Sequence, residues 1–106
     1  MRVLVAIEDD YRLYREMLAA VLRINRPDAE VESATLESLE EELERFDPQV
    51  IICSGNKDVK SNGGRVWIEL FLGSALPTKV STGHGGSYEL ANPRLEGLLK
   101  VIDDLQ

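Results

Sequence analysis

Apolar residues in the first quarter of the chain change from an unbroken run to helical spacing. The run Val3 to Ile7 is typical of a strand covered on both faces. From residue 11 to 25, apolar side chains recur at helical spacing, and Pro27 disfavours helical geometry in the residue before it. The apolar positions of this helix are Tyr14, Leu18, Val21 and Leu22. The sequence therefore predicts a strand followed by a helix.

The next part of the chain repeats this order. Residues 29–35 predict a short strand, and the charges at Glu30 and Glu32 suit the edge of a sheet. Thr35 is a suitable N-cap for a second helix, and residues 50–53 form a third apolar strand. The apolar positions of the second helix are Leu36, Leu39, Leu43 and Phe46. This β-α-β-α-β order predicts parallel strands with right-handed crossovers.

The second half does not continue this alternation. Residues 54–64 are rich in turn formers and predict a loop. Residues 65–72 and 78–82 predict strands, and the five-residue link between them is too short for a parallel crossover, so an antiparallel hairpin is expected. Residues 83–91, which include the glycine-rich stretch 83–87, are expected to be a loop. Asn92 then caps a final helix that buries Leu95, Leu98, Ile102 and Leu105.

Composition narrows the class of protein. The 106 residues suit a single domain, 1–106, with one core. No apolar run is long enough to cross a bilayer, so no membrane association is expected. The single cysteine, Cys53, allows no internal disulfide and suggests the cytoplasm. With only one histidine as well, His84, a structural zinc site is disfavoured.

The net charge of −7 comes from one segment. Residues 28–47 hold nine acidic side chains and one basic side chain, Arg45. Nucleic acid is therefore not an expected partner, because a duplex requires a basic contact face. The segment predicts a solvated helix face, with a docking face for a basic partner as the alternative.

Two stretches resemble the receiver domain of two-component response regulators. The first is "VLVAIEDDYRLYREMLAAVL", an apolar strand with acids at its end and an arginine, Arg15, in the following helix. The second is "FDPQVIIC", which resembles the strand that ends in the phosphoacceptor aspartate of that family. The resemblance covers residues 1–54. It implies a three-layer α/β receiver-like half, followed here by the hairpin and the final helix.

The resemblance also implies a site. In receiver domains two acids after the first strand hold Mg²⁺ while an aspartate accepts a phosphoryl group. The acids correspond to Asp9 and Asp10, or to a pair in which Glu8 replaces Asp10 if the strand shifts by one residue. The acceptor position corresponds to Ser54, an alcohol that is a poor nucleophile without a base and cannot form an acyl phosphate. The resemblance thus implies a non-enzymatic, phosphorylation-independent pseudo-receiver that needs no cofactor, and it leaves open whether the acids bind Mg²⁺ weakly.

Three alternatives accompany this interpretation. The acids of residues 8–10 can simply begin a helix, where the dipole favours negative charge. A Mg²⁺-dependent phosphoryl-handling protein would use Asp9 and Asp10. A thiol or serine hydrolase would draw on Cys53, Ser54 and His84, and would need His84 near Ser54.

The resemblance suggests a homodimer formed through the C-terminal elements. Trp67 and Phe71 would contribute to its surface if they face outward, whereas the favoured interpretation is that they pack in the core against the final helix.

Overall fold

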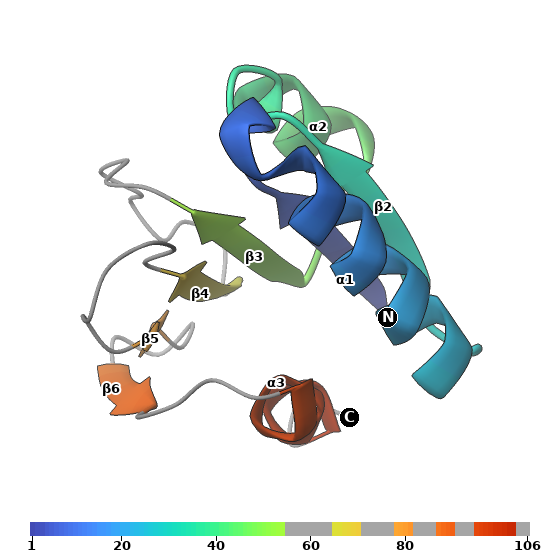
Figure 1. Cartoon of the computed structure of the whole chain (residues 1–106), viewed down its shortest axis with the longest axis vertical. Coiled ribbons are helices and arrows are strands. Elements are labelled where there is room, and N and C mark those ends of the chain that lie inside the picture. The colour runs from blue at the N-terminus through green and yellow to red at the C-terminus, as the bar shows by residue number, and fades with distance from the viewer. Residues whose placement is uncertain (55–64, 71–77, 82–86, 91–94, 104–106) are drawn as a thin grey trace.

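The computed structural model describes residues 1–54, 65–70, 78–81, 87–90 and 95–103. These residues form a mixed β-sheet flanked by helices (Figure 1). The protein is therefore of the α/β class, as the sequence predicts.

Among the described residues, the sheet has six strands in the order β2-β1-β3-β4-β5-β6. The first four strands in this order are parallel neighbours, whereas β4–β5 and β5–β6 pair antiparallel. The strands are β1 (Arg2–Ala6), β2 (Glu30–Ala34), β3 (Val50–Ser54), β4 (Val66–Leu70), β5 (Thr78–Ser81) and β6 (Ser87–Leu90). The parallel half and the antiparallel β4–β5 hairpin are both confirmed, and β2 lies at an edge as its alternating charges predict.

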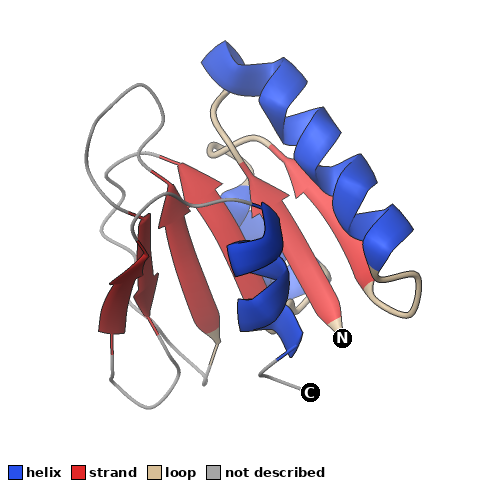
Figure 2. Ribbon diagram, turned by 60° about the horizontal axis from the view of Figure 1, so that its bottom comes forward, coloured by secondary structure: helices blue, strands red, loops and turns tan. Residues whose placement is uncertain are grey.

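Helices cover both faces of the sheet. A short 3-10 helix η1 leads into α1, which packs with α3 on one face, while α2 packs on the other (Figure 2). The helices are η1 (Asp9–Tyr11), α1 (Arg12–Asn25), α2 (Leu39–Arg45) and α3 (Leu95–Asp103). The first predicted helix agrees with α1 to within one residue.

The apolar runs of β1 and β3 build two cores. Successive side chains point to opposite faces of a strand. Val3 and Val5 therefore join the core under α1 and α3, while Leu4 and Ala6 join the core under α2. Each run is apolar throughout because both of its faces are covered.

The second helix begins later than the sequence predicts. Thr35 does not cap it, since α2 starts at Leu39 with Ser38 as its N-cap. The Thr35 hydroxyl accepts a hydrogen bond from the Ser38 amide over 3.3 Å, and the Ser38 hydroxyl donates to the Thr35 carbonyl over 3.1 Å. Such local bonds offer the backbone an alternative to a helical turn, which explains the delay.

The prediction that residues 83–91 form a loop is wrong in part. Residues Ser87–Leu90 form β6, which pairs with β5 from Ser81 opposite Ser87 to Thr78 opposite Leu90. The predicted cap Asn92 and the buried position Leu105 lie outside the described residues. The direction of the strand after the loop is also resolved, because β4 runs parallel to β3.

Trp67 is buried in the core under α2, so it is not available as an outward-facing association surface. The predicted packing of Trp67 against the final helix is wrong, because α3 belongs to the core on the other face of the sheet. Phe71 lies outside the described residues. Within the described part of the chain, no helix has the length and apolar character that crossing a membrane requires.

Candidate functional site

The carboxyl ends of β1 and β3 lie side by side. The two strands are parallel neighbours with Ala6 opposite Cys53, so the chain leaves β1 next to Ser54, the last residue of β3. In open α/β sheets, ligands bind outside this end of the strands, where the strand order reverses. The structure therefore brings Ser54 and the residues after β1 to one place, as the sequence predicts.

The Ser54 side chain is buried in this site and accepts a hydrogen bond there. The residue is only 1% exposed, and its Oγ accepts a hydrogen bond from the Glu8 amide over 3.1 Å. This bond satisfies a backbone donor that has left the β1 ladder. The hydroxyl of Ser54 therefore links the β1–η1 turn to β3.

A buried arginine also occupies this end of the sheet. Nη1 of Arg15 donates to the Ile7 carbonyl over 2.9 Å and to Oδ1 of Asp9 over 3.1 Å. The Arg15 side chain is 9% exposed, whereas the Asp9 side chain is 72% exposed. A guanidinium removed from water requires such acceptors, so the Asp9 carboxylate serves as its counter-charge.

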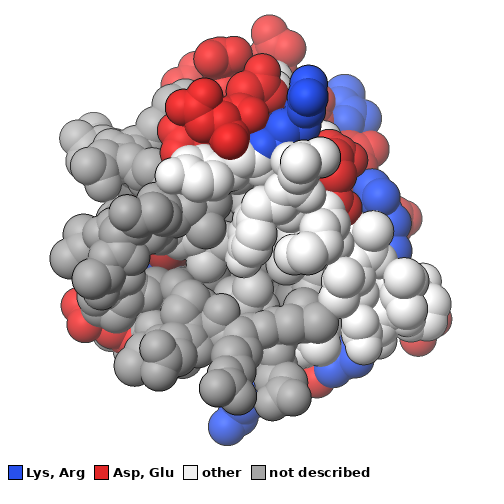
Figure 3. Space-filling model, in the orientation of Figure 1, with Lys and Arg blue, Asp and Glu red and all other residues white. Residues whose placement is uncertain are grey.

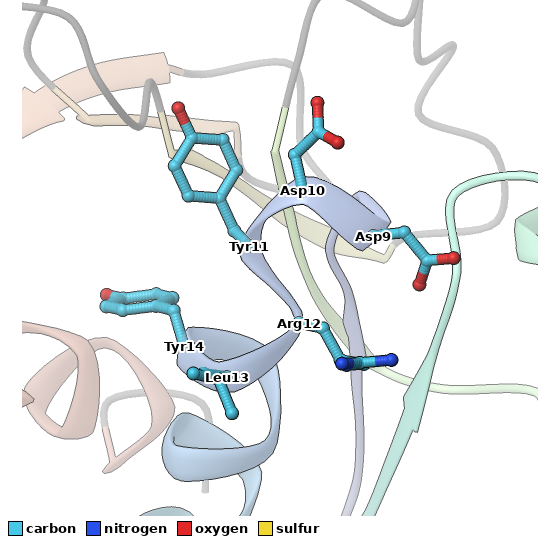
Figure 4. A pocket seen from close by; sticks show the side chains of 6 residues that line it. All are labelled: Asp9, Asp10, Tyr11, Arg12, Leu13 and Tyr14. Atoms are coloured by element: carbon cyan, nitrogen blue, oxygen red, sulfur yellow. The ribbon is translucent and has the colours of Figure 1, made fainter.

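The two aspartates of η1 differ in environment. Their side chains point in different directions from η1, as Figure 4 shows. Asp9 pairs with Arg15, whereas no ion pair within the described part of the chain involves Asp10. Both lie beside an open hollow of about 340 Å³, lined by residues 9–14. The Tyr14 side chain is half-buried there, which raises the pKa of its phenol above the usual value.

The predicted magnesium ligands Glu8, Asp9 and Asp10 are neighbours in the chain at this site. Among the residues that the structure describes, no three histidine, cysteine or acidic side chains converge in a way that could hold a metal ion. The magnesium site stays a prediction.

Cys53 is separated from the hollow. It is buried in the core under α2, on the face opposite the Val50 and Ile52 side chains. Burial, with a smaller contribution from the Glu69 carboxylate, raises the pKa of the Cys53 thiol to about 12. The thiol is therefore protonated at neutral pH and is a poor nucleophile. His84 lies outside the described residues, so the predicted arrangement of Cys53, Ser54 and His84 is not placed.

The α2 part of the acidic segment, residues 28–47, lies at a charged end of the molecule, whereas Glu30 at the start of β2 lies at the opposite end of the sheet. Figure 3 shows acidic side chains gathered over the end that holds η1 and α2. Arg45, its single basic residue, hydrogen bonds to Glu32 and Glu42 and links α2 to β2. This hydrogen bond from Arg45 holds the pKa of the Glu42 carboxyl below its usual value. Glu40, Glu41 and Glu44 remain exposed, in agreement with a solvated helix face.

The ion pair between Arg15 and Asp9 was not predicted from the sequence, although the sequence contains a signal for a buried arginine. The signal was present, because Arg15 occupies a core position of α1 and is spaced three, four and seven residues from buried apolar side chains. These are Leu18, Ala19 and Leu22. A lone arginine on an apolar helix face indicates a buried cation, and the nearest acids before it are its natural partners.

No protein-family model matches the chain, and comparisons with curated proteins and with solved structures also give no match.

Proposed function

We propose that this protein is a non-enzymatic signalling module, a cytoplasmic receiver-like domain of residues 1–106 that binds protein partners without being phosphorylated. The parallel order β2-β1-β3-β4 supports this, since it is the order of doubly wound flavodoxin-like sheets. The antiparallel strands β5 and β6 set the C-terminal half apart from a wholly parallel sheet.

The observation that carries the proposal is the state of Ser54. A phosphoacceptor must present its nucleophilic oxygen to the donor with a base or metal nearby. The Ser54 oxygen is instead buried and accepts the Glu8 amide hydrogen. Phosphorylation at this oxygen would require breaking that bond and opening the turn after β1.

The contact between Arg15 and Asp9 supports the same conclusion. A divalent cation prefers carboxylate oxygens that no other cation neutralises. The Arg15 guanidinium already lies 3.1 Å from Oδ1 of Asp9. An internal cation thus compensates one of the two acids that a receiver domain would offer to Mg²⁺.

The alternative function is Mg²⁺-dependent phosphoryl handling. The observation in its favour is the hollow beside Asp9 and Asp10, both of which have exposed carboxylates. We favour the non-enzymatic function because Ser54 is buried and Asp9 is paired.

The test is exposure of the full chain to acetyl phosphate with and without Mg²⁺, followed by intact-mass spectrometry. We expect no phosphoryl adduct on the wild type. A Mg²⁺-dependent adduct would contradict the proposal. The matched comparison is Ser54→Asp, which places a carboxylate at the acceptor position. An adduct on this variant alone would trace the loss of phosphorylation to Ser54.

A further inference from the structure

Helix α1 is apolar on two opposite sides. Its inner side packs on the sheet through Leu18, Ala19 and Leu22. Its outer side carries Leu13, Met17 and Ile24, which are 83%, 52% and 78% exposed. Ala20, also exposed, lies between the last two. A surface helix normally places polar residues opposite its buried side, so this second apolar side needs its own explanation.

The four outer residues form one stripe, which we call the α1 stripe: Leu13, Met17, Ala20 and Ile24. Figure 3 shows uncharged side chains over the position of α1, with charged side chains along the border nearer β2. All the large hydrophobic side chains that are exposed among the described residues belong to this stripe. Such a concentration marks a contact surface, whereas scattered exposed apolar residues do not.

The spacing of the α1 stripe is symmetric about its centre. Its successive intervals are four, three and four residues, the spacing of the seam between two packed helices. A two-fold axis through the middle of the stripe therefore places Leu13 opposite Ile24 of a second copy, and Met17 opposite Ala20. The large residues then meet at both ends, and the long Met17 side chain meets the small Ala20. The stripe is complementary to itself when two helices run antiparallel.

The two borders of the stripe support the same arrangement. One border carries Glu16 and Arg23, and the other carries Tyr14 and Val21. In an antiparallel pair, each border meets the same border of the second copy. Glu16 then faces Arg23 of the other chain twice, and the uncharged borders meet each other. A parallel pair would place the charged border against the uncharged one.

Intrachain contacts fix the two charged side chains along this border. Oε1 of Glu16 accepts hydrogen bonds from Arg15 and Ser33, and Nε and Nη2 of Arg23 donate to the Val31 carbonyl. Within the described part of the chain, these hydrogen bonds use neither the second carboxylate oxygen of Glu16, Oε2, nor the Nη1 atom of Arg23. These are the atoms that would reach across the interface.

From this self-complementarity we propose that the protein forms a two-fold homodimer in which the α1 helices pack antiparallel through the α1 stripe. The interface is smaller than the 20–30 residues per side of a standard complex, so the dissociation constant should be about 10–1000 µM. The dimer uses the outer side of α1, where Leu13 also lines the hollow beside Asp9 and Asp10, but it does not involve Ser54, on which the proposed function rests. Its test is therefore independent of the proposed function.

The first test is sedimentation velocity of the full chain from about 10 µM to 2 mM, a range chosen to span that dissociation constant. We expect a concentration-dependent monomer–dimer equilibrium. Leu13→Gln and Ile24→Gln should each weaken the dimer at least about tenfold, because each loses buried apolar area at two places. Both side chains are exposed in the monomer, so the thermal midpoint of the dilute protein should be unchanged. Glu44→Gln, on the other face of the sheet, is the matched control and should dimerise like the wild type.

A wild type that stays monomeric over this range would overturn the proposal and leave the stripe to a different partner. Gln variants that dimerise as well as the wild type would overturn it too.

The second test exchanges charges across the two-fold axis. Glu16→Arg alone should weaken the dimer by about tenfold, because it places two pairs of arginines face to face. Arg23→Glu alone should also weaken the dimer by about tenfold, because it places two pairs of glutamates face to face. When the two variants are mixed, each chain faces the opposite charge, and the mixture should associate more tightly than either variant alone. A mixture no tighter than its components would overturn the antiparallel arrangement.

Discussion

Replacing Asp9 by asparagine tests whether this carboxylate is the counter-charge of Arg15. The substitution removes the charge but keeps an oxygen that can accept a hydrogen bond from Nη1 of Arg15. Replacing Arg15 by methionine removes the cation while filling the space of its apolar stem. With the double variant, the two changes form a thermodynamic cycle that isolates the energy of the pair.

The structure bounds the size of this energy. At 3.1 Å, two unit charges attract by roughly 1.3 kcal/mol in water and about 5 kcal/mol at an effective dielectric constant of ~20. The Asp9 side chain is 72% exposed, so the pair lies near the lower value. The cost of ordering the side chains lowers it further. We expect a coupling energy of about 1 kcal/mol.

The assay is equilibrium unfolding in urea at pH 7 and low salt. Asp9→Asn should lower the urea midpoint by about 0.5 M, given the slope expected for a domain of this size. Asp10→Asn is the matched control, because Asp10 shares the helix-terminal position but has no ion pair within the described residues. It should show no coupling to Arg15. A coupling energy indistinguishable from zero for Asp9 and Arg15 would refute the pairing.

Three further predictions concern single side chains. Ser54→Ala should destabilise the fold by about 1–3 kcal/mol in urea unfolding, because the Glu8 amide loses its buried acceptor, and an unchanged stability would contradict that role. Cys53 should resist Ellman's reagent at pH 8 until the protein is unfolded, because burial raises the pKa of its thiol to about 12. Rapid labelling of the native protein would show instead that the thiol is accessible. Because the pKa of Glu42 is lowered in the folded protein, its carboxylate contributes stability above the ordinary pKa of 4.5, and this contribution is lost as the pH falls below that value. Glu42→Gln should therefore make the thermal midpoint less sensitive to acid. A pH profile identical to that of the wild type would argue against the bond from Arg45.

The parallel half of the fold was predictable because its apolar patterns are strong. The unbroken runs of β1 and β3 require cover on both faces, and the short links permit only simple crossovers. The start of α2 was not predictable to the residue, because the Thr35 and Ser38 hydroxyls form local bonds that compete with the first helical turn. The strand Ser87–Leu90 was missed because it is four residues long, and pairing with β5 decides its conformation more than its own propensity does.

The candidate site was predictable in position but not in detail. Residues at the carboxyl ends of parallel strands meet at one edge, so the proximity of Glu8 and Ser54 follows from the order of the elements. Which of these groups is buried depends on tertiary contacts. The bond from the Glu8 amide to Ser54 joins residues 46 positions apart, and the pairing of Asp9 with Arg15 depends on how α1 lies on the sheet.

We infer that the site after β1 and β3 does not handle Mg²⁺ or phosphoryl groups. The most direct measurement is an amide-resolved NMR titration of the full chain with Mg²⁺ and then acetyl phosphate. We expect no specific, saturable shifts of the amide signals of residues 8–10, 53 and 54 up to several millimolar Mg²⁺, and no change on adding acetyl phosphate. Saturable shifts at these residues at millimolar or lower Mg²⁺ would contradict it and make phosphoryl handling the better account of the protein.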